Sequence, residues 1–431
     1  MTTPPPTIVI ETHGCKLNQA DSEALARRFV LAGCRVARPG EAADVYVVNT
    51  CTVTHQADAD ARKALRAARR RHPRAVLVAA GCYAQRAPAE LARLGVDLVV
   101  GNREKHALVE QVLGVLGAAP VPCATGAEPL APGLLGRTRA FVKVQEGCNQ
   151  VCAYCIVPRV RGRERSVPPD ELVRQVQERV AGGYQEAVLT GTQLGTYGFD
   201  LPGASLEGLV RRVLEETAVP RLRVSSLQPQ EVTEGLLHLW QEFPQRLCPH
   251  FHLPLQSGSD AVLRRMRRRY TTAQYRDAVA RIREAVPDAA VTCDLIVGFP
   301  GETEEDFEAG LALGREAMLA GMHVFPYSVR PGTSAAHFQP RVEEGVKERR
   351  MARALALGRE LAVAFRRRSL GQVRPVLWEG VKLSQGRPAW TGLTDTYLRV
   401  YLPSPQAVAA PITPVRLVAE AEDGLLGEVV G

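Results

Sequence analysis

Short apolar runs alternate with amphipathic stretches over residues 7–117. The runs are TIVIET at 7–12, DVYVVN at 44–49, AVLVAA at 75–80 and DLVV at 97–100. The segments between them have helical spacing, which predicts strands that alternate with helices. Strands of a parallel sheet that is covered on both faces are almost continuously apolar, as these runs are. We therefore expect an N-terminal parallel α/β domain over residues 6–117.

A second alternating region follows a stretch rich in proline, glycine and alanine. Residues 118–136 have no periodicity and little charge, which is typical of a linker. Over residues 137–366 a helical segment follows each of six strand candidates, which lie at 140–145, 186–190, 221–226, 250–255, 291–297 and 322–327. Six β/α units predict a partial (β/α)6 barrel, because the usual closed barrel has eight.

The hydrophobic pattern changes again after the basic segment FRRRS at 365–369. The segments that follow are short and broken by glycine and proline, among them VRPVLWEGVKL, TYLRVYL and ITPVRLVAEA. This pattern predicts a small antiparallel β domain over residues 369–431, about the size of an oligonucleotide-binding barrel. The chain as a whole is expected to be an α/β protein that ends in this β domain.

Composition excludes some classes of protein. The chain has 431 residues and no apolar run near the roughly 18 to 20 residues that cross a bilayer, so we expect no membrane span. Its start has no basic stretch followed by an apolar one, so we expect a cytoplasmic protein whose 10 cysteines are reduced. The net charge is +8, from 54 basic and 46 acidic residues. Most of the basic residues are arginine, which suits a polyanion such as RNA but also follows from genome composition or growth temperature.

The segment GCNQVCAYC contains the strongest chemical signal. It places Cys148, Cys152 and Cys155 in a C-x3-C-x2-C pattern just beyond the first strand of the predicted barrel. A structural zinc site needs a fourth ligand, and neither this loop nor the following IVPRVRGRER has another cysteine or a histidine. A cubane [4Fe–4S] cluster held by three cysteines leaves one iron open for chemistry. A zinc site with a distant fourth ligand and a redox-active thiol pair remain alternatives.

Three more cysteines follow strands of the predicted N-terminal sheet. Cys15 comes after TIVIETHG, Cys51 after DVYVVNT and Cys82 after AVLVAAG. Because ligands bind at the carboxyl edge of open α/β sheets, we expect these thiolates to converge into a second three-thiolate site. Taken singly, each is more simply a small buried apolar residue, so the prediction depends on their equivalent placement. We assign the remaining cysteines to packing or to the surface: Cys34, Cys123, Cys248 and Cys293.

Together these features resemble the radical S-adenosylmethionine (SAM) methylthiotransferases. The resemblance covers nearly the whole chain and lies in the C-terminal β domain and in THGCKLNQADSE (12–23), NTCTVT (49–54), AAGCYAQ (79–85) and VKVQEGCNQVCAYCIVPRVRGRERS (142–166). It implies a cluster domain, a radical SAM barrel and a C-terminal TRAM domain. It also implies two [4Fe–4S] clusters: a radical SAM cluster on Cys148, Cys152 and Cys155, and an auxiliary cluster on Cys15, Cys51 and Cys82.

The resemblance implies a reaction that needs both clusters. In this family the open iron of the radical SAM cluster binds SAM, and one electron cleaves SAM to methionine and a 5′-deoxyadenosyl radical. A second SAM methylates a sulfur at the auxiliary cluster, and the resulting methylthio group is inserted at an unactivated C–H bond. The implied partners are a low-potential electron donor and a sulfur source. The sequence requires no protein acid or base.

Parts of the predicted barrel resemble the branch of the family that acts on tRNA. HLPLQSGSD at 252–260 and VFPYSVRPGT at 324–333 are similar to enzymes that modify C2 of N6-threonylcarbamoyladenosine, beside the anticodon. One position departs from that pattern, since Gln228 stands where glutamate is often found. Related branches modify isopentenyladenosine in tRNA or an aspartate of a ribosomal protein, and these remain alternatives. A non-catalytic, zinc-bearing RNA-binding protein is an alternative of another class.

Contacts to SAM and RNA are predicted from strand ends and charge. Thr190 and Gly191 end the second barrel strand and Gln256 ends the fourth, on the edge where SAM is expected, although a simple tight turn accounts for each equally well. Five arginines within 264–269 suit the phosphates of a tRNA anticodon stem-loop, or are simply solvated. The domain at 369–431 has five basic and six acidic residues, so RNA binding there would depend on shape and aromatic side chains.

Overall fold

The chain forms two compact units in the computed structural model, which describes residues 4–117, 132, 135, 138–384, 386–403, 408 and 410–430. The first unit comprises Met1–Tyr184, Thr190–Gln193 and Ser328–Ala336. The second comprises Gln185–Leu189, Leu194–Tyr327 and His337–Gly431. The linker expected at 118–136 lies almost wholly outside the described residues, as does Cys123.

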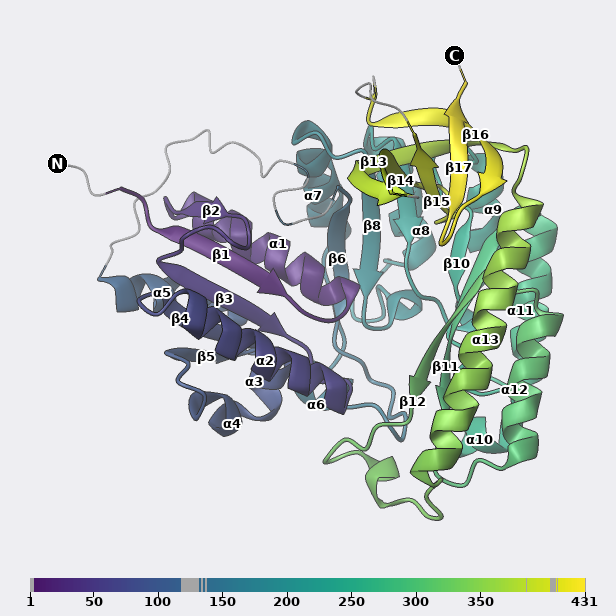
Figure 1. The fold of residues 1–431 in the computed structure, drawn as a ribbon, viewed down its shortest axis with the longest axis horizontal. Helices are drawn as coiled ribbons and strands as arrows, with labels where there is room; N and C mark the ends of the chain where they lie inside the picture. Colours follow the sequence, from purple (N-terminus) through teal and green to yellow (C-terminus); the bar gives the residue numbers. More distant parts are fainter. Residues whose placement is uncertain are drawn as a thin grey trace. The chain divides into compact units, whose positions relative to one another are not determined.

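The first unit begins with a parallel sheet in the strand order β2-β1-β3-β4-β5 (Figure 1). Its strands are β1 (Thr7–Thr12), β2 (Arg35–Ala37), β3 (Val45–Thr50), β4 (Val76–Gly81) and β5 (Leu98–Gly101). The four apolar runs of the sequence form β1, β3, β4 and β5 to within one residue, which confirms the predicted parallel sheet. The edge strand β2 is only three residues long, too short to give a pattern of its own.

Helices cover both faces of this sheet. They are α1 (Lys16–Leu31), α2 (His55–Arg71), α3 (Cys82–Arg86), α4 (Pro88–Ala92), η1 (Lys105–Ala107) and α5 (Leu108–Leu116). Alternate strand residues face opposite sides, so Ile8 and Val47 pack with Phe29 of α1, whereas Val9 and Val48 pack with Leu65 of α2. Each strand is therefore buried on both faces.

The first unit continues into the start of the predicted barrel. Strand β6 (Ala140–Glu146) pairs antiparallel with the short β7 (Arg165–Ser166), and α6 (Val157–Arg161) and α7 (Pro169–Ala181) belong to the same unit. Helix α1 lies beside β6, because the buried carboxylate of Glu23 accepts a hydrogen bond from the backbone N–H of Phe141 at 3.3 Å. The N-terminal sheet domain and β6 are thus held together by α1.

The second unit contains the rest of the β/α alternation. Its strands are the greater part of β8 (Glu186–Gly191), β9 (Arg221–Val224), β10 (His250–His252), β11 (Ala290–Val297) and β12 (Gly321–Pro326). Strand β8 pairs in parallel with β9, and β10, β11 and β12 form a parallel sheet. Its helices are η2 (Leu194–Thr196), α8 (Leu206–Glu216), η3 (Pro229–Glu231), α9 (Glu234–Glu242), α10 (Asp260–Arg265), α11 (Thr272–Ala285), α12 (Glu304–Glu316) and α13 (Glu344–Arg368). A further short helix, η4 (Ser334–His337), begins in the first unit.

The chain ends in a small closed β-barrel within the second unit. Its strands are β13 (Val373–Ser384), β14 (Arg387–Thr394), β15 (Arg399–Leu402), β16 (Ile412–Glu420) and β17 (Leu425–Val429), in the closed order β13-β14-β15-β17-β16. All neighbours are antiparallel except β15 and β17, which are parallel. Trp378 lies in its core and donates a hydrogen bond to Thr413 Oγ1 at 2.7 Å. The predicted antiparallel β domain is confirmed, with this one parallel pair as an addition.

In the described part of the chain, no helix combines the length and the apolar character that a membrane span requires.

Candidate functional site

The carboxyl edge of the N-terminal sheet brings Cys15, Cys51 and Cys82 together. Cys15 is the N-cap of α1, Cys51 directly follows β3, and Cys82 begins α3. A Cβ atom on Gly14 would lie 2.5 Å from Cβ of Cys51, so the turn that carries Cys15 lies directly against Cys51. Burial, together with the nearby charges of Cys15 and Cys82, raises the pKa of Cys51 to about 12. The three thiols are therefore close enough to act on one another electrostatically.

Side-chain amides and hydroxyls tie the three cysteine-bearing turns together. The Nδ2 of Asn18, in the first turn of α1, donates to the carbonyl of His13 at 2.7 Å and to that of Thr50 at 3.1 Å. The hydroxyl of Thr50 donates to the carbonyl of Ala80 at 2.6 Å. Asn18 thus links the first turn to the second, and Thr50 links the second to the third.

The Gly14→Ala variant tests whether this edge depends on close backbone approach. Gly14 has φ +100° and faces Cys51, whereas Gly40 has φ +104° and nothing within 4 Å of the place where its Cβ would be. Backbone strain alone costs of order 1–3 kcal/mol at either position. We expect Gly40→Ala to lose only the stability that corresponds to this backbone strain. Gly14→Ala should lose more stability than Gly40→Ala. After anaerobic reconstitution it should also bind only about four irons per chain instead of roughly eight. Equal losses of stability and unchanged iron in both variants would contradict this account.

Cys148, Cys152 and Cys155 lie on a loop that packs against the backbone of Gly162 and Arg163. Gly147 has φ +77°, and a Cβ there would lie 2.0 Å from the carbonyl oxygen of Arg163. The backbone N–H of Cys148 donates to the carbonyl of Gly162 at 3.1 Å, and that of Cys155 donates to the carbonyl of Cys152 at 3.1 Å. These contacts gather three half-buried thiols into one short loop.

The two groups of cysteines lie on neighbouring elements of the first unit. Cys82 packs against Ile156 and Val160, which follow Cys155. The Nδ2 of Asn102 donates to Sγ of Cys82 at 3.3 Å and to the carbonyl of Val160 at 2.9 Å. Cys82 is therefore anchored directly to the segment that carries the second group.

A segment of the first unit that is far from the cysteines in the sequence, Ser328–Ala336, contacts both groups of cysteines, and we call it the strap. The side chain of Arg330 is buried and its Nη1 donates to Asp58 Oδ2 at 2.7 Å and to the carbonyl of Thr52, next to Cys51, at 3.0 Å. At its other end the backbone N–H of Ala335 donates to the carbonyl of Ala153, between Cys152 and Cys155, at 2.8 Å. In the sequence, VRPGT resembles one branch of the family, but no local pattern indicates these contacts.

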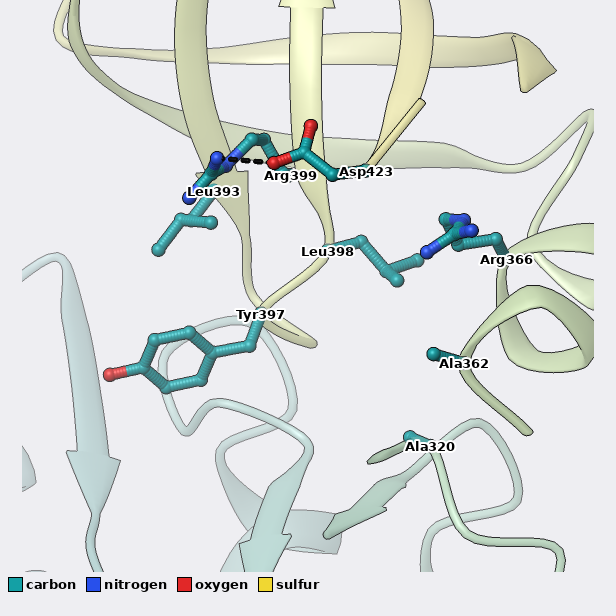
Figure 2. A pocket seen from close by; sticks show the side chains of 8 residues that line it. All are labelled: Ala320, Ala362, Arg366, Leu393, Tyr397, Leu398, Arg399 and Asp423. Atoms are coloured by element: carbon teal, nitrogen blue, oxygen red, sulfur yellow. Dashed lines mark hydrogen bonds and ion pairs between the residues drawn. The ribbon is translucent and has the colours of Figure 1, made fainter. Parts of the chain in front are cut away.

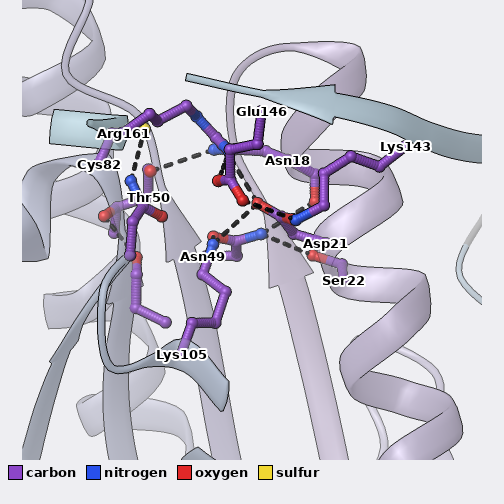
Figure 3. A network of polar contacts seen from close by, with 12 residues as sticks. Asn18, Asp21, Ser22, Asn49, Thr50, Cys82, Lys105, Lys143, Glu146 and Arg161 are labelled. Carbon is purple, nitrogen blue, oxygen red and sulfur yellow. Dashed lines mark hydrogen bonds and ion pairs between the residues drawn. The ribbon is translucent and has the colours of Figure 1, made fainter. Parts of the chain in front are cut away.

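A buried ionic network, which we call the Asp21 network, lies behind these cysteines (Figure 3). Asp21 of α1 accepts from Nζ of Lys105 at 2.9 Å, from Nζ of Lys143 at 2.7 Å and from Nη2 of Arg161 at 3.1 Å. Burial alone would raise the pKa of Asp21, but these three cations hold it well below its usual range. Arg161 also donates to Glu146 Oε1 at 2.6 Å. No local pattern in the sequence indicates a role for any member of this network.

The donor set fits cubane clusters better than single ions. Among the described residues, no group of three or more histidine, cysteine, aspartate or glutamate side chains is arranged to hold one metal ion. A cubane binds each cysteine through a different iron, so its three thiolates lie farther apart than the ligands of one zinc ion. Two sets of three thiols, each gathered by close backbone contacts, therefore suit two clusters that each have one open iron.

The residues expected to contact SAM occupy constrained positions. Thr190 is buried, and a Cβ on Gly191 would lie 3.1 Å from Oε1 of Gln145, so a larger residue there would press on that side chain. In the second unit Gln256 has φ +61° and its backbone N–H donates to the carbonyl of Asp294 at 2.8 Å. The assignment of Thr190, Gly191 and Gln256 as SAM contacts stays a prediction.

Some of the arginines at 264–269 and of the C-terminal aromatic side chains pack against other residues of the second unit, while others are exposed. Arg265 and Arg268 lie over the rings of Phe338 and Tyr270, although Arg265 remains exposed. Trp390 is half-buried, and Tyr397 lies under the guanidinium of Arg223, whose Cζ is 3.6 Å from the ring centroid. These aromatic side chains therefore serve packing within the second unit.

A cavity of about 340 Å³ lies elsewhere, within the second unit. It is lined by Ala320, Ala362, Arg366, Leu393, Tyr397, Leu398, Arg399 and Asp423. Figure 2 shows the ion pair between Arg399 and Asp423, 2.6 Å long, on one side and Ala362 and Arg366 on another. None of the cysteines lines this cavity, so it is distinct from the candidate site.

Two regions of the chain match known protein families. Residues 142–313 match the radical SAM superfamily. Residues 7–101, which carry Cys15, Cys51 and Cys82, match a family described as uncharacterized protein family UPF0004.

Similar proteins align over most of the chain. The threonylcarbamoyladenosine tRNA methylthiotransferase MtaB of Bacillus subtilis is 37% identical over 96% of this chain and 94% of its own length. Its namesake in Aquifex aeolicus is 40% identical over 80% of this chain and 86% of its own length. The tRNA-2-methylthio-N(6)-dimethylallyladenosine synthase of Syntrophobacter fumaroxidans is 36% identical over 99% of this chain and 96% of its own length.

Solved structures support the fold alone. The radical S-adenosylmethionine methyltransferase TsrM of Kitasatospora setae, with cobalamin and a [4Fe–4S] cluster bound, has a TM-score of 0.54 and 15% sequence identity, and the match covers 77% of each chain.

Proposed function

The chain belongs to the radical SAM methylthiotransferase family, and from that premise we propose that it inserts a methylthio group at C2 of N6-threonylcarbamoyladenosine in tRNA. The observation that carries the proposal is a pair of three-cysteine groups on neighbouring elements of one unit. The substrate follows from the two relatives named for threonylcarbamoyladenosine tRNA. Because tRNA is the substrate, we place the reaction in the cytoplasm.

We assign the six cysteines to two [4Fe–4S] clusters. Cys148, Cys152 and Cys155 would hold the cluster that binds SAM, and Cys15, Cys51 and Cys82 would hold the auxiliary cluster. When bound, these cofactors supply the adenosyl radical that removes hydrogen from the base and the methylthio group that replaces it. Thr190, Gly191 and Gln256 remain the proposed contacts of SAM.

The protein itself contributes position and shielding. The packing of Cys82 on Ile156 and Val160 keeps the two groups of cysteines close, so that a substrate radical has a short path to the sulfur donor. The strap contacts the backbone next to Cys51 and the backbone between Cys152 and Cys155, so it fixes their spacing. Burial of Cys51 and Cys82 limits access of water to reactive intermediates.

The proposal implies three kinds of partner. The anticodon stem-loop of tRNA would meet exposed arginines such as Arg264, Arg267 and Arg269. A low-potential electron donor and a sulfur source are required because the reaction consumes electrons and sulfur.

A second candidate substrate is isopentenyladenosine in tRNA. It is favoured by the relative from Syntrophobacter fumaroxidans, which aligns over 99% of this chain and is named for dimethylallyladenosine. The identity to this relative is close to that of the threonylcarbamoyladenosine enzymes, so only the product nucleoside separates the two branches.

Nucleoside mass spectrometry of tRNA tests the proposal. In a strain that lacks this gene we expect the methylthiolated threonylcarbamoyl nucleoside to disappear and its precursor to accumulate. The wild-type gene should restore the product, whereas the Cys51→Ala gene should not. Loss of methylthiolated isopentenyladenosine instead would show that the branch is wrong. Unchanged nucleosides in a strain without a redundant enzyme would show that the function is wrong.

A further inference from the structure

Arg161 is a buried cation beside the cysteines of the N-terminal group, and we propose that it is the counter-charge that stabilises the reduced state of the auxiliary cluster. The inference rests on the proposed function, because that function assigns a cluster to Cys15, Cys51 and Cys82. It makes Arg161 a positioning residue that acts through the field it exerts on the cluster.

Arg161 is held rigidly between the two cysteine-bearing segments. It ends α6, and its side chain is only 2% exposed. Its guanidinium donates to Glu146, to Asp21 and to the side-chain carbonyl of Asn18, which lies one turn of α1 beyond Cys15. Such a multiply bonded guanidinium cannot swing away without breaking several charge-assisted hydrogen bonds.

The backbone next to Arg161 is also tied to Cys82. The carbonyl of the preceding residue, Val160, accepts a hydrogen bond from Asn102, whose Nδ2 also donates to Sγ of Cys82. Figure 3 shows Arg161 at the edge of the Asp21 network that faces Cys82. Burial opposes the charge on Arg161, but the charges of Cys82, Asp21 and Cys15 raise the pKa of Arg161 above its usual range.

The charges of the Asp21 network complement those of a cluster. Its cations are Lys105, Lys143 and Arg161 and its carboxylates are Asp21 and Glu146, so three positive and two negative charges leave one net positive charge. A [4Fe–4S] core with two positive charges and three thiolates carries one negative charge, and reduction by one electron makes it two. In a buried, weakly screened site the network therefore stabilises the reduced form more than the oxidised form.

Two variants change this charge in opposite directions. Arg161→Met removes the positive charge at similar side-chain length, whereas Glu146→Gln removes a negative charge and keeps an oxygen that can accept from Arg161. Arg161→Lys keeps the charge but not the planar fork. Arg69→Met serves as the control. Arg69 is also an ion-paired arginine of the first unit, 2.6 Å from Asp97, but it lies in the last turn of α2, whereas Cys51 precedes the first turn of that helix.

The midpoint potential of the auxiliary cluster is the decisive measurement. It is read by electron paramagnetic resonance during a reductive titration of the full chain in which Cys148, Cys152 and Cys155 are alanine, so that only the auxiliary cluster remains. We expect Arg161→Met to disfavour the reduced state at least tenfold, which is about 59 mV for a one-electron couple. Glu146→Gln should shift the potential to more positive values, and Arg161→Lys and Arg69→Met should stay near the parent.

Failure of this inference is distinguishable from failure of the proposed function. If the parent with three alanines binds no cluster at Cys15, Cys51 and Cys82, both the function and the inference fail. If it binds one but Arg161→Met and Glu146→Gln shift the potential in the same direction or leave it unchanged, only the inference fails. If Arg161→Met does not assemble a cluster, a positive shift in Glu146→Gln supports the inference and any other result for that variant overturns it.

Discussion

Replacing Cys51 by alanine is expected to abolish insertion of sulfur while SAM cleavage stays measurable. Cys51 lies on the N-terminal sheet edge with Cys15 and Cys82, whereas the loop of Cys148 is closed by its own contacts with Gly162 and Arg163. The two groups can therefore be lost separately. After anaerobic reconstitution we expect about four irons per chain instead of roughly eight, 5′-deoxyadenosine under reducing conditions, and no methylthiolated nucleoside.

The matched control for this experiment is Cys34→Ala. Cys34 is a buried cysteine of the same unit that packs in the hydrophobic core between the sheet and α1. It should retain the full iron content and both activities, with only a modest loss of stability from the smaller side chain. The separation of duties would be refuted if Cys51→Ala lost SAM cleavage although its radical SAM cluster was intact by spectroscopy.

The Glu186→Ala variant is expected to lose about 3 to 5 kcal/mol of stability in the second unit, because it removes the carboxylate that pairs directly with two buried guanidinium groups. Glu186 is fully buried, and its two oxygens accept from Nε of Arg221 at 2.6 Å and from Nε of Arg223 at 3.0 Å. Arg221 also donates to the carbonyls of Pro375 and Leu393 in the C-terminal barrel. The loss of Glu186 therefore weakens the attachment of that barrel as well.

Tryptophan fluorescence during urea unfolding measures this effect selectively. The chain has 3 tryptophans, Trp240, Trp378 and Trp390, and all lie in the second unit. Glu242→Ala is the matched control, because Glu242 forms a partly exposed pair with Arg211 at 2.7 Å, and solvent screens such pairs so that they contribute little to stability. Equal shifts of the unfolding midpoint in the two variants would contradict the buried-charge explanation.

The sequence indicated the candidate cysteines because their signals are local. Three thiols within eight residues of one loop are visible as spacing, and the equivalent placement of Cys15, Cys51 and Cys82 after strands is visible as periodicity. Parallel strands align their carboxyl ends, so the sheet converts that equivalence into proximity without further information. The edge strand β2 and the parallel pairing of β15 with β17 were missed, since neither leaves a repeating pattern in the sequence.

The amino-acid sequence by itself determined the order of strands and helices, the class of each domain and the six candidate ligands, since these depend on periodicity and short-range spacing. Only the tertiary structure decided which charged side chains surround the cysteines. Arg161 meets Asp21 across 140 positions of sequence, and Arg330 meets Asp58 across 272. A single pair contact at such separation has no local pattern, because it is set by the packing of whole elements.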